Sequence, residues 1–323
     1  GTYEANLAMH GCDLMLNLGA RFDDRVTGLI SGFSPNSTKI HCDIDPSSVN
    51  KNVAVDLAVI GDATKILEAL IAEMKKRKFK PHKTSLDKWW SQIEVWRKRD
   101  CLRFNQTGSI IKPQHAIKRL CEMTAERDVY VTTEVGQHQM WAAQYFDFHL
   151  PNRWMTSGGL GTMGYGLPAA LGVQVAHPGA TVIDIAGEAS FMMNMQELST
   201  LSQYNLPVKM FIINNEWMGM VRQWQELIHG GRYSESYSAS LPDFRKLADT
   251  FNMTGLVAQS SDDLDSVITQ MLDTPGPVIA DIRVAKEENC FPMIPSGAAH
   301  NDMLLGPEDQ AEKPVSEEGM VLV

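Results

Sequence analysis

Hydrophobic and polar residues alternate along this chain in two patterned blocks that are joined by a charged stretch. In the first block, buried-strand patterns run over 13–19 and 39–45, and apolar residues recur at helical spacing over 63–75. Strands that alternate with helices favour a doubly wound parallel sheet. The first block is therefore predicted to have an α/β fold.

The second block continues this alternation from about residue 112 to about residue 300. Its pattern predicts helices over 113–123, 167–176, 191–204, 243–251 and 262–272, and a helix that opens at Gln139. It predicts strands over 128–133, 181–185, 208–213 and 278–284. The segment after Pro307 is rich in Pro and Glu, which is typical of a mobile tail.

The stretch between the blocks, residues 75–103, is basic and aromatic. It holds eleven Lys or Arg residues against three acidic ones, together with Trp89, Trp90 and Trp96. Such a stretch can be a nucleic-acid surface. We favour a linker with a surface helix whose tryptophans pack inward, because the rest of the chain is acidic.

Composition narrows the class of protein further. The chain has 323 residues and a net charge of −10, which suggests roughly two domains and argues against nucleic acid as a partner. No apolar run approaches the ~18 residues of a membrane span, and no secretory signal opens the sequence. Five cysteines without a CxxC pair indicate a reducing, intracellular compartment. We expect a cytoplasmic protein of a bacterial cytosol, and an organelle stays open as the alternative.

Four loops that follow predicted strands contain unusual residues. Ligands of open α/β sheets bind beyond the carboxyl ends of the strands, so these loops are candidates for a site. Loop 134–138 places Gly136 and polar residues at a helix start, where free N–H groups favour an anion. Loop 157–166 has five glycines in residues 158–166, which lets backbone approach a ligand closely.

The other two loops, 187–190 and 214–215, offer Glu188 and an Asn pair. Acid and amide oxygens at two neighbouring strand ends can share one Mg²⁺, which often completes its shell with phosphate oxygens. Each loop alone is explained as a cap or a turn. Together the four loops predict a metal–diphosphate site.

These residues resemble a known motif. The thiamine-diphosphate motif begins Gly-Asp-Gly and ends Asn-Asn, and here GEA at 187–189 precedes Asn215 by 28 positions, as in that family. The flanking segments resemble the large catalytic subunit of acetolactate synthase along nearly the whole chain. The segments that carry this resemblance are GARFDDRVTG, GQHQMWAAQ, GGLGTMGYGLPAA, MQELSTLSQYNLPVK, GMVRQWQE and PMIPSGA.

The resemblance implies which residues bind thiamine diphosphate. The cofactor-binding positions are Gly136, Gln137, His138, Gly161, Met163, Gly187, Ala189, Ser190, Gly219 and Met220. It implies Mg²⁺ ligands at Glu188, Asn215 and the carbonyl of Trp217. It implies catalytic positions at Met163, Met220 and Trp224, with Trp224 and Ser296 lining the substrate channel.

The resemblance also implies a structural FAD. Its contacts are expected at Gly19, Arg21, Asp23, Arg25, Asp43, Ile44, Asp62, Gly158 and Gly159. The expected domains are the rear part of a central FAD-binding domain (1–75), a linker helix (76–111), a thiamine-diphosphate domain (112–300) and a tail (301–323). For Arg21, Asp23 and Arg25, a surface salt-bridge cluster without a flavin is the competing interpretation.

The implied activity is decarboxylation of pyruvate and condensation of the two-carbon unit with pyruvate or 2-oxobutyrate, in branched-chain amino acid biosynthesis. Implied partners are a second copy in a homodimer or homotetramer and a small regulatory subunit, with no nucleic acid and no membrane. Two alternatives stay open: another thiamine-diphosphate enzyme such as a pyruvate oxidase, and a non-catalytic cofactor-binding relative.

The sequence departs from the family pattern at two positions, and it does not supply one of the family's domains. Glu188 and Ala189 stand where aspartate and glycine are expected, and a longer carboxylate still reaches a cation if the strand end recedes. The glutamate that activates the cofactor in this family belongs to an N-terminal domain that Gly1–Val323 does not supply. We therefore expect a C-terminal fragment that has no carboligase activity alone.

Overall fold

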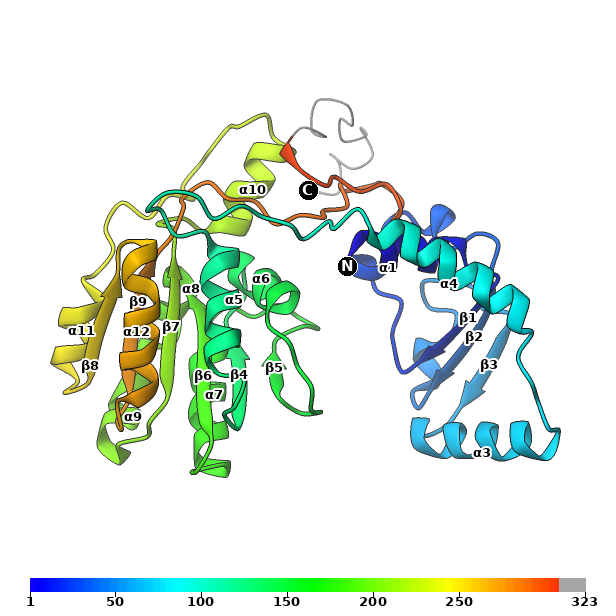
Figure 1. Ribbon diagram of the computed structural model, residues 1–323, viewed down its shortest axis with the longest axis horizontal. Helices are drawn as coiled ribbons and strands as arrows, with labels where there is room; N and C mark the ends of the chain where they lie inside the picture. The colour runs from blue at the N-terminus through cyan, green and yellow to red at the C-terminus, as the bar shows by residue number, and fades with distance from the viewer. Residues whose placement is uncertain (308–323) are drawn as a thin grey trace. The chain divides into compact units, whose positions relative to one another are not determined.

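The computed structural model describes residues 1–307, which form two compact units. The first unit contains Gly1–Arg103 and the segment that starts at Phe291, and the second unit contains Phe104–Cys290. Each unit is built on a parallel sheet with helices (Figure 1). The predicted α/β class is therefore confirmed.

The first unit has a three-stranded parallel sheet in the order β1-β2-β3. Its strands are β1 (Leu14–Leu18), β2 (Thr38–Asp43) and β3 (Leu57–Ile60). Its helices are α1 (Tyr3–Gly11), α2 (Asp24–Thr27), α3 (Ala63–Lys76) and α4 (Lys83–Arg97), with 3₁₀ turns at Ile30–Gly32 and Pro46–Ser48. All three strands run in one direction, so their carboxyl ends share one edge of the sheet.

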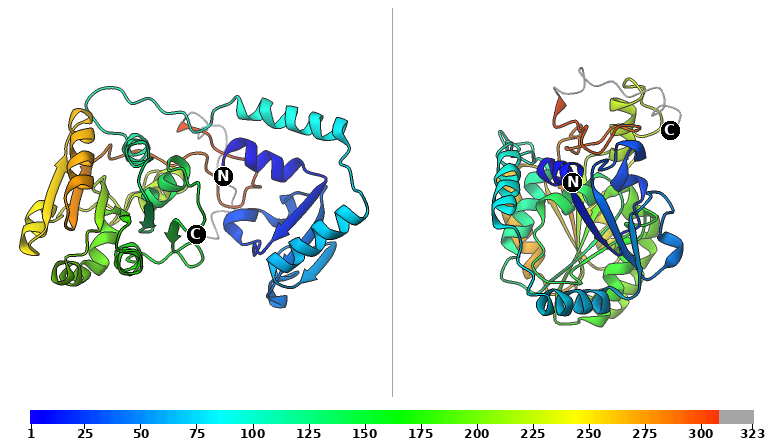
Figure 2. Two further views of the ribbon diagram at one scale, coloured as in Figure 1. Left: turned by 60° about the horizontal axis from the view of Figure 1, so that its bottom comes forward. Right: turned by 90° about the vertical axis from the view of Figure 1, so that its right-hand side faces the viewer.

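The basic stretch forms α4, which lies beside α1 (Figures 1 and 2). The rings of Trp89 and Trp96 are edge-to-face at 5.7 Å, and both approach Gly11 at the end of α1. Trp90 is 56% exposed, so the prediction of inward-packed tryptophans was wrong for this residue. Helical spacing places position 90 on another face from 89 and 96.

The segment after Phe291 returns to the first unit. The Leu29 N–H donates to the Ala298 carbonyl at 2.9 Å, and Gly28 forms an antiparallel bridge with Ala299. Residues 291–300 thus group with the first unit, whereas the sequence interpretation placed them with the second block. Most of the tail, residues 308–323, lies outside the described residues.

The second unit has six parallel strands in the order β5-β4-β6-β7-β9-β8. They are β4 (Val129–Thr133), β5 (Trp154–Thr156), β6 (Thr181–Gly187), β7 (Lys209–Asn214), β8 (Thr254–Ala258) and β9 (Val278–Arg283). The helices are α5 (Pro113–Met123), α6 (Gln137–Tyr145), α7 (Gly166–Ala176), α8 (Glu188–Phe191), α9 (Leu198–Tyr204), α10 (Gly219–Leu227), α11 (Phe244–Thr250) and α12 (Ser261–Asp273), with the 3₁₀ helix η3 at Met192–Glu197.

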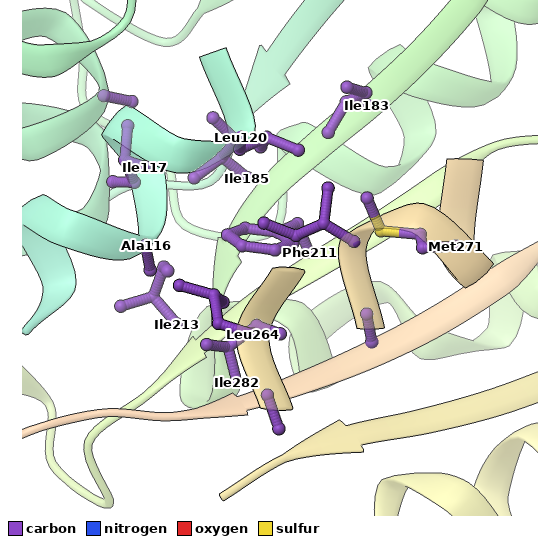
Figure 3. Close-up of a cluster of buried hydrophobic side chains, with 14 of the residues drawn as sticks. Ala116, Ile117, Leu120, Ile183, Ile185, Phe211, Ile213, Leu264, Met271 and Ile282 are labelled. Carbon is purple, nitrogen blue, oxygen red and sulfur yellow. The ribbon is translucent and has the colours of Figure 1, made fainter. Parts of the chain in front are cut away.

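Helices cover both faces of this sheet, and side chains alternate between them. On β7, Phe211 and Ile213 join the cluster beneath α5, α6 and α12, whereas Met210 and Ile212 join the cluster beneath α7, α9 and α11. Figure 3 shows the first cluster, with Phe211 among residues from α5, β6 and α12. Burial on both faces explains why these strands have nearly continuous apolar sequences.

Two predicted helices differ from the observed ones. The helix predicted over 191–204 is interrupted at Asn194, whose φ of −131° is not helical. The Asn194 side chain donates to the Gly164 carbonyl at 2.5 Å, so a tertiary contact competes with the helical pattern. The helix expected to open at Gln139 begins two residues earlier, at Gln137.

Two further observations concern segments and thiols. Within residues 1–307, no helix combines the length and hydropathy that a bilayer span requires. The five cysteines are free thiols.

Candidate functional site

A pocket lies where β4, β6 and β7 end in the second unit. It brings together residues from all four loops that the sequence singled out. The predicted site residues that line it are Gly136, Gln137, His138, Met163, Gly187, Glu188, Ala189, Ser190, Asn215, Trp217, Gly219 and Met220. The predicted residue Gly161 does not line it.

The first wall of the pocket is the turn from β4 into α6. Gly136 precedes α6 with φ of 154°, a conformation that L side chains rarely adopt. A Cβ there would lie 2.9 Å from the ring of His138. Backbone N–H groups in the first turn of a helix have no intrahelical partner, so the start of α6, which lines the pocket, suits an anion.

A second glycine contributes to the same packing. A Cβ on Gly187, the last residue of β6, would lie 2.7 Å from Nδ1 of His138. His138 is buried between these two glycines, and burial lowers its pKa to about 3. The imidazole is therefore neutral at physiological pH, and its Nε2 has no hydrogen-bond partner.

Glu188 follows Gly187 directly and is 1% exposed. Burial raises the pKa of Glu188 to about 8, although backbone N–H groups, including those of Asn215 and Trp217, oppose the shift. Its Oε1 is buried without a partner. A divalent cation beside this carboxylate would favour the charged form and occupy the unpaired oxygen, so the residues present fit a metal.

Another wall of the pocket is the turn after β7. The Trp217 N–H donates to Oδ1 of Asn215 at 3.1 Å, which fixes the side chain of Asn215. Glu216 lies between them with φ of 64°, a left-handed conformation that is uncommon for a residue other than glycine. The carboxylate of Glu216 accepts from Tyr237 Oη at 2.9 Å and pairs with Lys286, so ion pairing holds the strained turn.

The glycine-rich loop reaches the pocket through Met163. The carboxylate of Glu134, which is fully buried, accepts from the N–H of Gly164 at 2.6 Å and of Leu167 at 3.1 Å. Burial raises the pKa of Glu134. This residue, to which the sequence interpretation gave no role, ties the loop to the end of β4.

The sequence interpretation missed other lining residues as well. These are Val135, Trp141, Ile213, Met218 and Val221. They are apolar and follow ordinary core patterns, so nothing in the sequence distinguishes them from packing residues. Among residues 1–307, no three His, Cys, Asp or Glu side chains gather as a metal site.

Part of the predicted flavin set lies at one edge of the first unit's sheet. The Gly19 N–H donates to the Cys42 carbonyl at 2.8 Å, which places the end of β1 beside Asp43 at the end of β2. Ile44 is 71% exposed. Asp62 follows β3 and caps α3 through the Lys65 N–H. These four residues lie at or just after the carboxyl ends of β1, β2 and β3.

The arginines of this set form exposed ion pairs. Arg21 contacts Asp23 at 2.9 Å, and Arg25 contacts Asp24 at 2.7 Å. Exposed pairs of this kind contribute little to stability. They match the salt-bridge interpretation, and a flavin contact remains a prediction for these residues.

The remaining predicted residues are distributed between the units. Gly158 and Gly159 lie in the second unit, in the exposed loop after β5. Trp224 is half-buried on α10, also in the second unit, whereas Ser296 belongs to the first unit. Their flavin and channel roles remain predictions.

Comparison with known protein families identifies the class. The family "Thiamine pyrophosphate enzyme, central domain" matches residues 1–70, and "Thiamine pyrophosphate enzyme, C-terminal TPP binding domain" matches residues 134–282. The second match contains the pocket residues on β4, β6 and β7. The chain therefore belongs among the thiamine pyrophosphate enzymes.

Within that class, the chain is homologous to acetolactate synthase large subunits. It is 44% identical to the large subunit of Haemophilus influenzae over 94% of this chain and 53% of that protein. It is 44% identical to the isozyme 3 large subunit of Escherichia coli, and 46% identical to the large subunit of Buchnera aphidicola subsp. Schizaphis graminum, each over 94% of this chain. The chain spans about half the length of these relatives.

Proposed function

We propose that this chain is the part of an acetolactate synthase catalytic subunit that binds the diphosphate end of thiamine diphosphate. The carrying observation is the pocket, in which an anion-binding helix start, a buried unpaired carboxylate and an Asn amide meet. The homology to acetolactate synthase large subunits supports the reaction. The reaction joins the two-carbon unit of pyruvate, after loss of CO₂, to pyruvate or 2-oxobutyrate.

Different residues of the chain are proposed to bind the diphosphate and the cation. The backbone N–H groups of Gln137 and His138 would hold the diphosphate at the N-terminus of α6, and the neutral His138 would add no charge of its own. Glu188, Asn215 and the carbonyl of Trp217 would hold Mg²⁺ through their oxygen atoms. When bound, the cofactor supplies an electron sink for the carbon that loses CO₂.

The apolar wall serves a different purpose. Met163 and Met220 line the pocket among Trp141 and Val221, where they exclude water and shape the space around the cofactor. Trp224, further along α10, is proposed to limit the size of the second 2-oxo acid. A dry, shaped wall favours the carbon–carbon step over reaction with water.

We propose FAD as a second cofactor at the strand ends of the first unit. Support comes from the four residues that lie at this edge of the sheet, Gly19, Asp43, Ile44 and Asp62, and from the homology to the acetolactate synthases. A cytoplasmic location, self-association and a small regulatory subunit are proposed on the same homology.

The test uses the full-length protein that contains this chain. With pyruvate, thiamine diphosphate, Mg²⁺ and FAD, we expect acetolactate to form while the flavin stays oxidised, which is followed by its absorbance. Bleaching of the flavin by pyruvate would favour a pyruvate oxidase instead. Tight cofactor binding without any product would favour a non-catalytic relative.

A further inference from the structure

A buried chain of side-chain amides runs from the core of the second unit to the pocket. Its inner member is Gln223 on α10, which is fully buried. Gln223 Oε1 accepts from the Cys290 N–H at 2.8 Å and from Gln137 Nε2 at 2.8 Å. Gln223 Nε2 donates to the Cys290 carbonyl at 3.1 Å.

The backbone of Cys290 determines which way the amide of Gln223 faces. A peptide N–H can only donate and a carbonyl can only accept, so the oxygen of Gln223 must face the N–H and its NH₂ must face the carbonyl. An inverted amide would leave two buried backbone groups without partners.

The segment that contains Cys290 is itself held in place. Arg222, which is 1% exposed, donates to the Glu288 carbonyl at 3.2 Å and to Asn289 Oδ1 at 2.6 Å. The Glu288 carboxylate also pairs with Lys112 and accepts from Gln114 at 3.0 Å. The backbone of Cys290, which orients the Gln223 amide, is therefore held rigidly.

The orientation of the Gln223 amide determines that of the Gln137 amide. Because Gln223 presents an oxygen, Gln137 must present its NH₂, which also donates to the Glu288 carbonyl at 2.9 Å. The oxygen of Gln137 is then directed at Asn215, whose Nδ2 donates to it at 3.2 Å. Asn215 is thereby left with its oxygen facing away from Gln137, toward the Trp217 N–H.

Close packing keeps the side-chain amides of Gln137 and Asn215 in contact with each other. A Cβ on Gly219 would lie 2.1 Å from Oε1 of Gln137 and 2.9 Å from Nδ2 of Asn215. The start of α10 can approach the two amides only because residue 219 has no side chain. The amides of Gln137 and Asn215 are thus held against each other, so the orientation of one determines that of the other.

We propose that Gln223 is a positioning residue that, through Gln137, keeps the oxygen rather than the NH₂ of Asn215 available to the divalent cation beside Glu188. The inference rests on the proposed function. An inverted Asn215 would present two N–H dipoles to the cation, which would oppose binding. Gln223 touches neither the cation nor the cofactor in this account, and its influence passes only through Gln137.

The test measures cation affinity apart from cofactor affinity. Mn²⁺ replaces Mg²⁺ as an electron paramagnetic resonance probe, and it is titrated into the chain with saturating thiamine diphosphate. Gln223→Met, which keeps length and removes the amide, is expected to raise the Mn²⁺ dissociation constant about tenfold. Cofactor affinity at saturating Mn²⁺ should change little. The melting temperature should fall, because the buried N–H and carbonyl of Cys290 lose their partner.

A matched control lies on the same helix. Gln225 donates to the Ser234 carbonyl at 2.9 Å and accepts from Ser236 at 2.6 Å, so Gln225→Met removes an amide with no link to Gln137. It should leave the Mn²⁺ affinity unchanged.

The outcomes separate the two proposals. Unchanged Mn²⁺ affinity in Gln223→Met would overturn the positioning role and leave the proposed function standing. Equal losses of Mn²⁺ affinity and of cofactor affinity at saturating Mn²⁺ would show a merely structural role and overturn it as well. No cofactor-dependent Mn²⁺ binding by the unaltered chain would overturn both.

Discussion

The carboxylate of Glu134, at the end of β4, accepts a hydrogen bond from the Gly164 N–H at 2.6 Å, thirty residues further along the chain. This bond places Met163, the neighbour of Gly164, in the wall of the pocket. A glycine-rich loop has many accessible conformations, so a buried anchor is needed to select one.

The anchor predicts a stability loss. Glu134→Ala leaves the N–H groups of Gly164 and Leu167 without their acceptor in a buried site. We expect the free energy of unfolding to fall by about 3 kcal/mol, measured by urea denaturation. The exposed Glu126→Ala serves as the control and should shift it by less than about 0.5 kcal/mol. Equal stability of the two variants would show that Glu134 anchors nothing.

A second prediction concerns pH and Asp184. Burial and the charge of Glu134 raise the pKa of Asp184 well above its usual range. Above the unfolded pKa of roughly 3.9, the unfolded chain releases this proton whereas the folded chain keeps it, so stability falls as pH rises toward the folded pKa. The slope is up to about 1.4 kcal/mol per pH unit.

Asp184→Asn removes this titration and keeps an acceptor for the Thr132 hydroxyl, 3.1 Å away in the parent. Its unfolding free energy should fall less steeply with pH than that of the parent chain. The exposed Asp262→Asn, which removes one charge elsewhere, should keep the parent slope. Parallel curves for Asp184→Asn and the parent would refute the assignment.

A third prediction concerns Gly219. Gly219→Ala would force a Cβ to within 2.1 Å of Gln137 Oε1, so the side chains of Gln137 and Asn215 must move. We expect at least a tenfold loss of Mg²⁺-dependent thiamine diphosphate affinity, measured by calorimetry. Gly172→Ala is the matched control on an open face of α7, where added helix propensity stabilises by about 0.5–1 kcal/mol. Equal cofactor affinity in both variants would contradict the packing argument.

The strands and most helices of the second unit were predictable because their patterns are strong. The helix Pro113–Met123 was predicted with its observed ends, since Pro113 suits a first turn and the apolar positions recur at helical spacing. Strands β4, β6, β7 and β9 have nearly continuous apolar sequences, a pattern that favours burial on both faces. Short edge strands such as β5, with three residues, carry too little pattern to be recognised.

Tertiary contacts account for what the sequence did not reveal. Asn194 interrupts a helical pattern because it donates to Gly164, a partner thirty residues away. Gln223 resembles any polar residue of a surface helix, and its role depends on Cys290, which lies 67 residues further along the chain. The predicted pocket residues were found because they cluster in four short loops or match the family's motifs, whereas their supports are dispersed.

The central claim is that Glu188 and its neighbours bind a cation together with a diphosphate. The most direct measurement is calorimetric titration of thiamine diphosphate into the chain and into Glu188→Ala, each with and without Mg²⁺. The account predicts Mg²⁺-dependent binding by the parent chain and none by Glu188→Ala, with the melting temperature of the variant not lowered. The same thiamine diphosphate affinity in both proteins, or binding by the parent that ignores Mg²⁺, would contradict it.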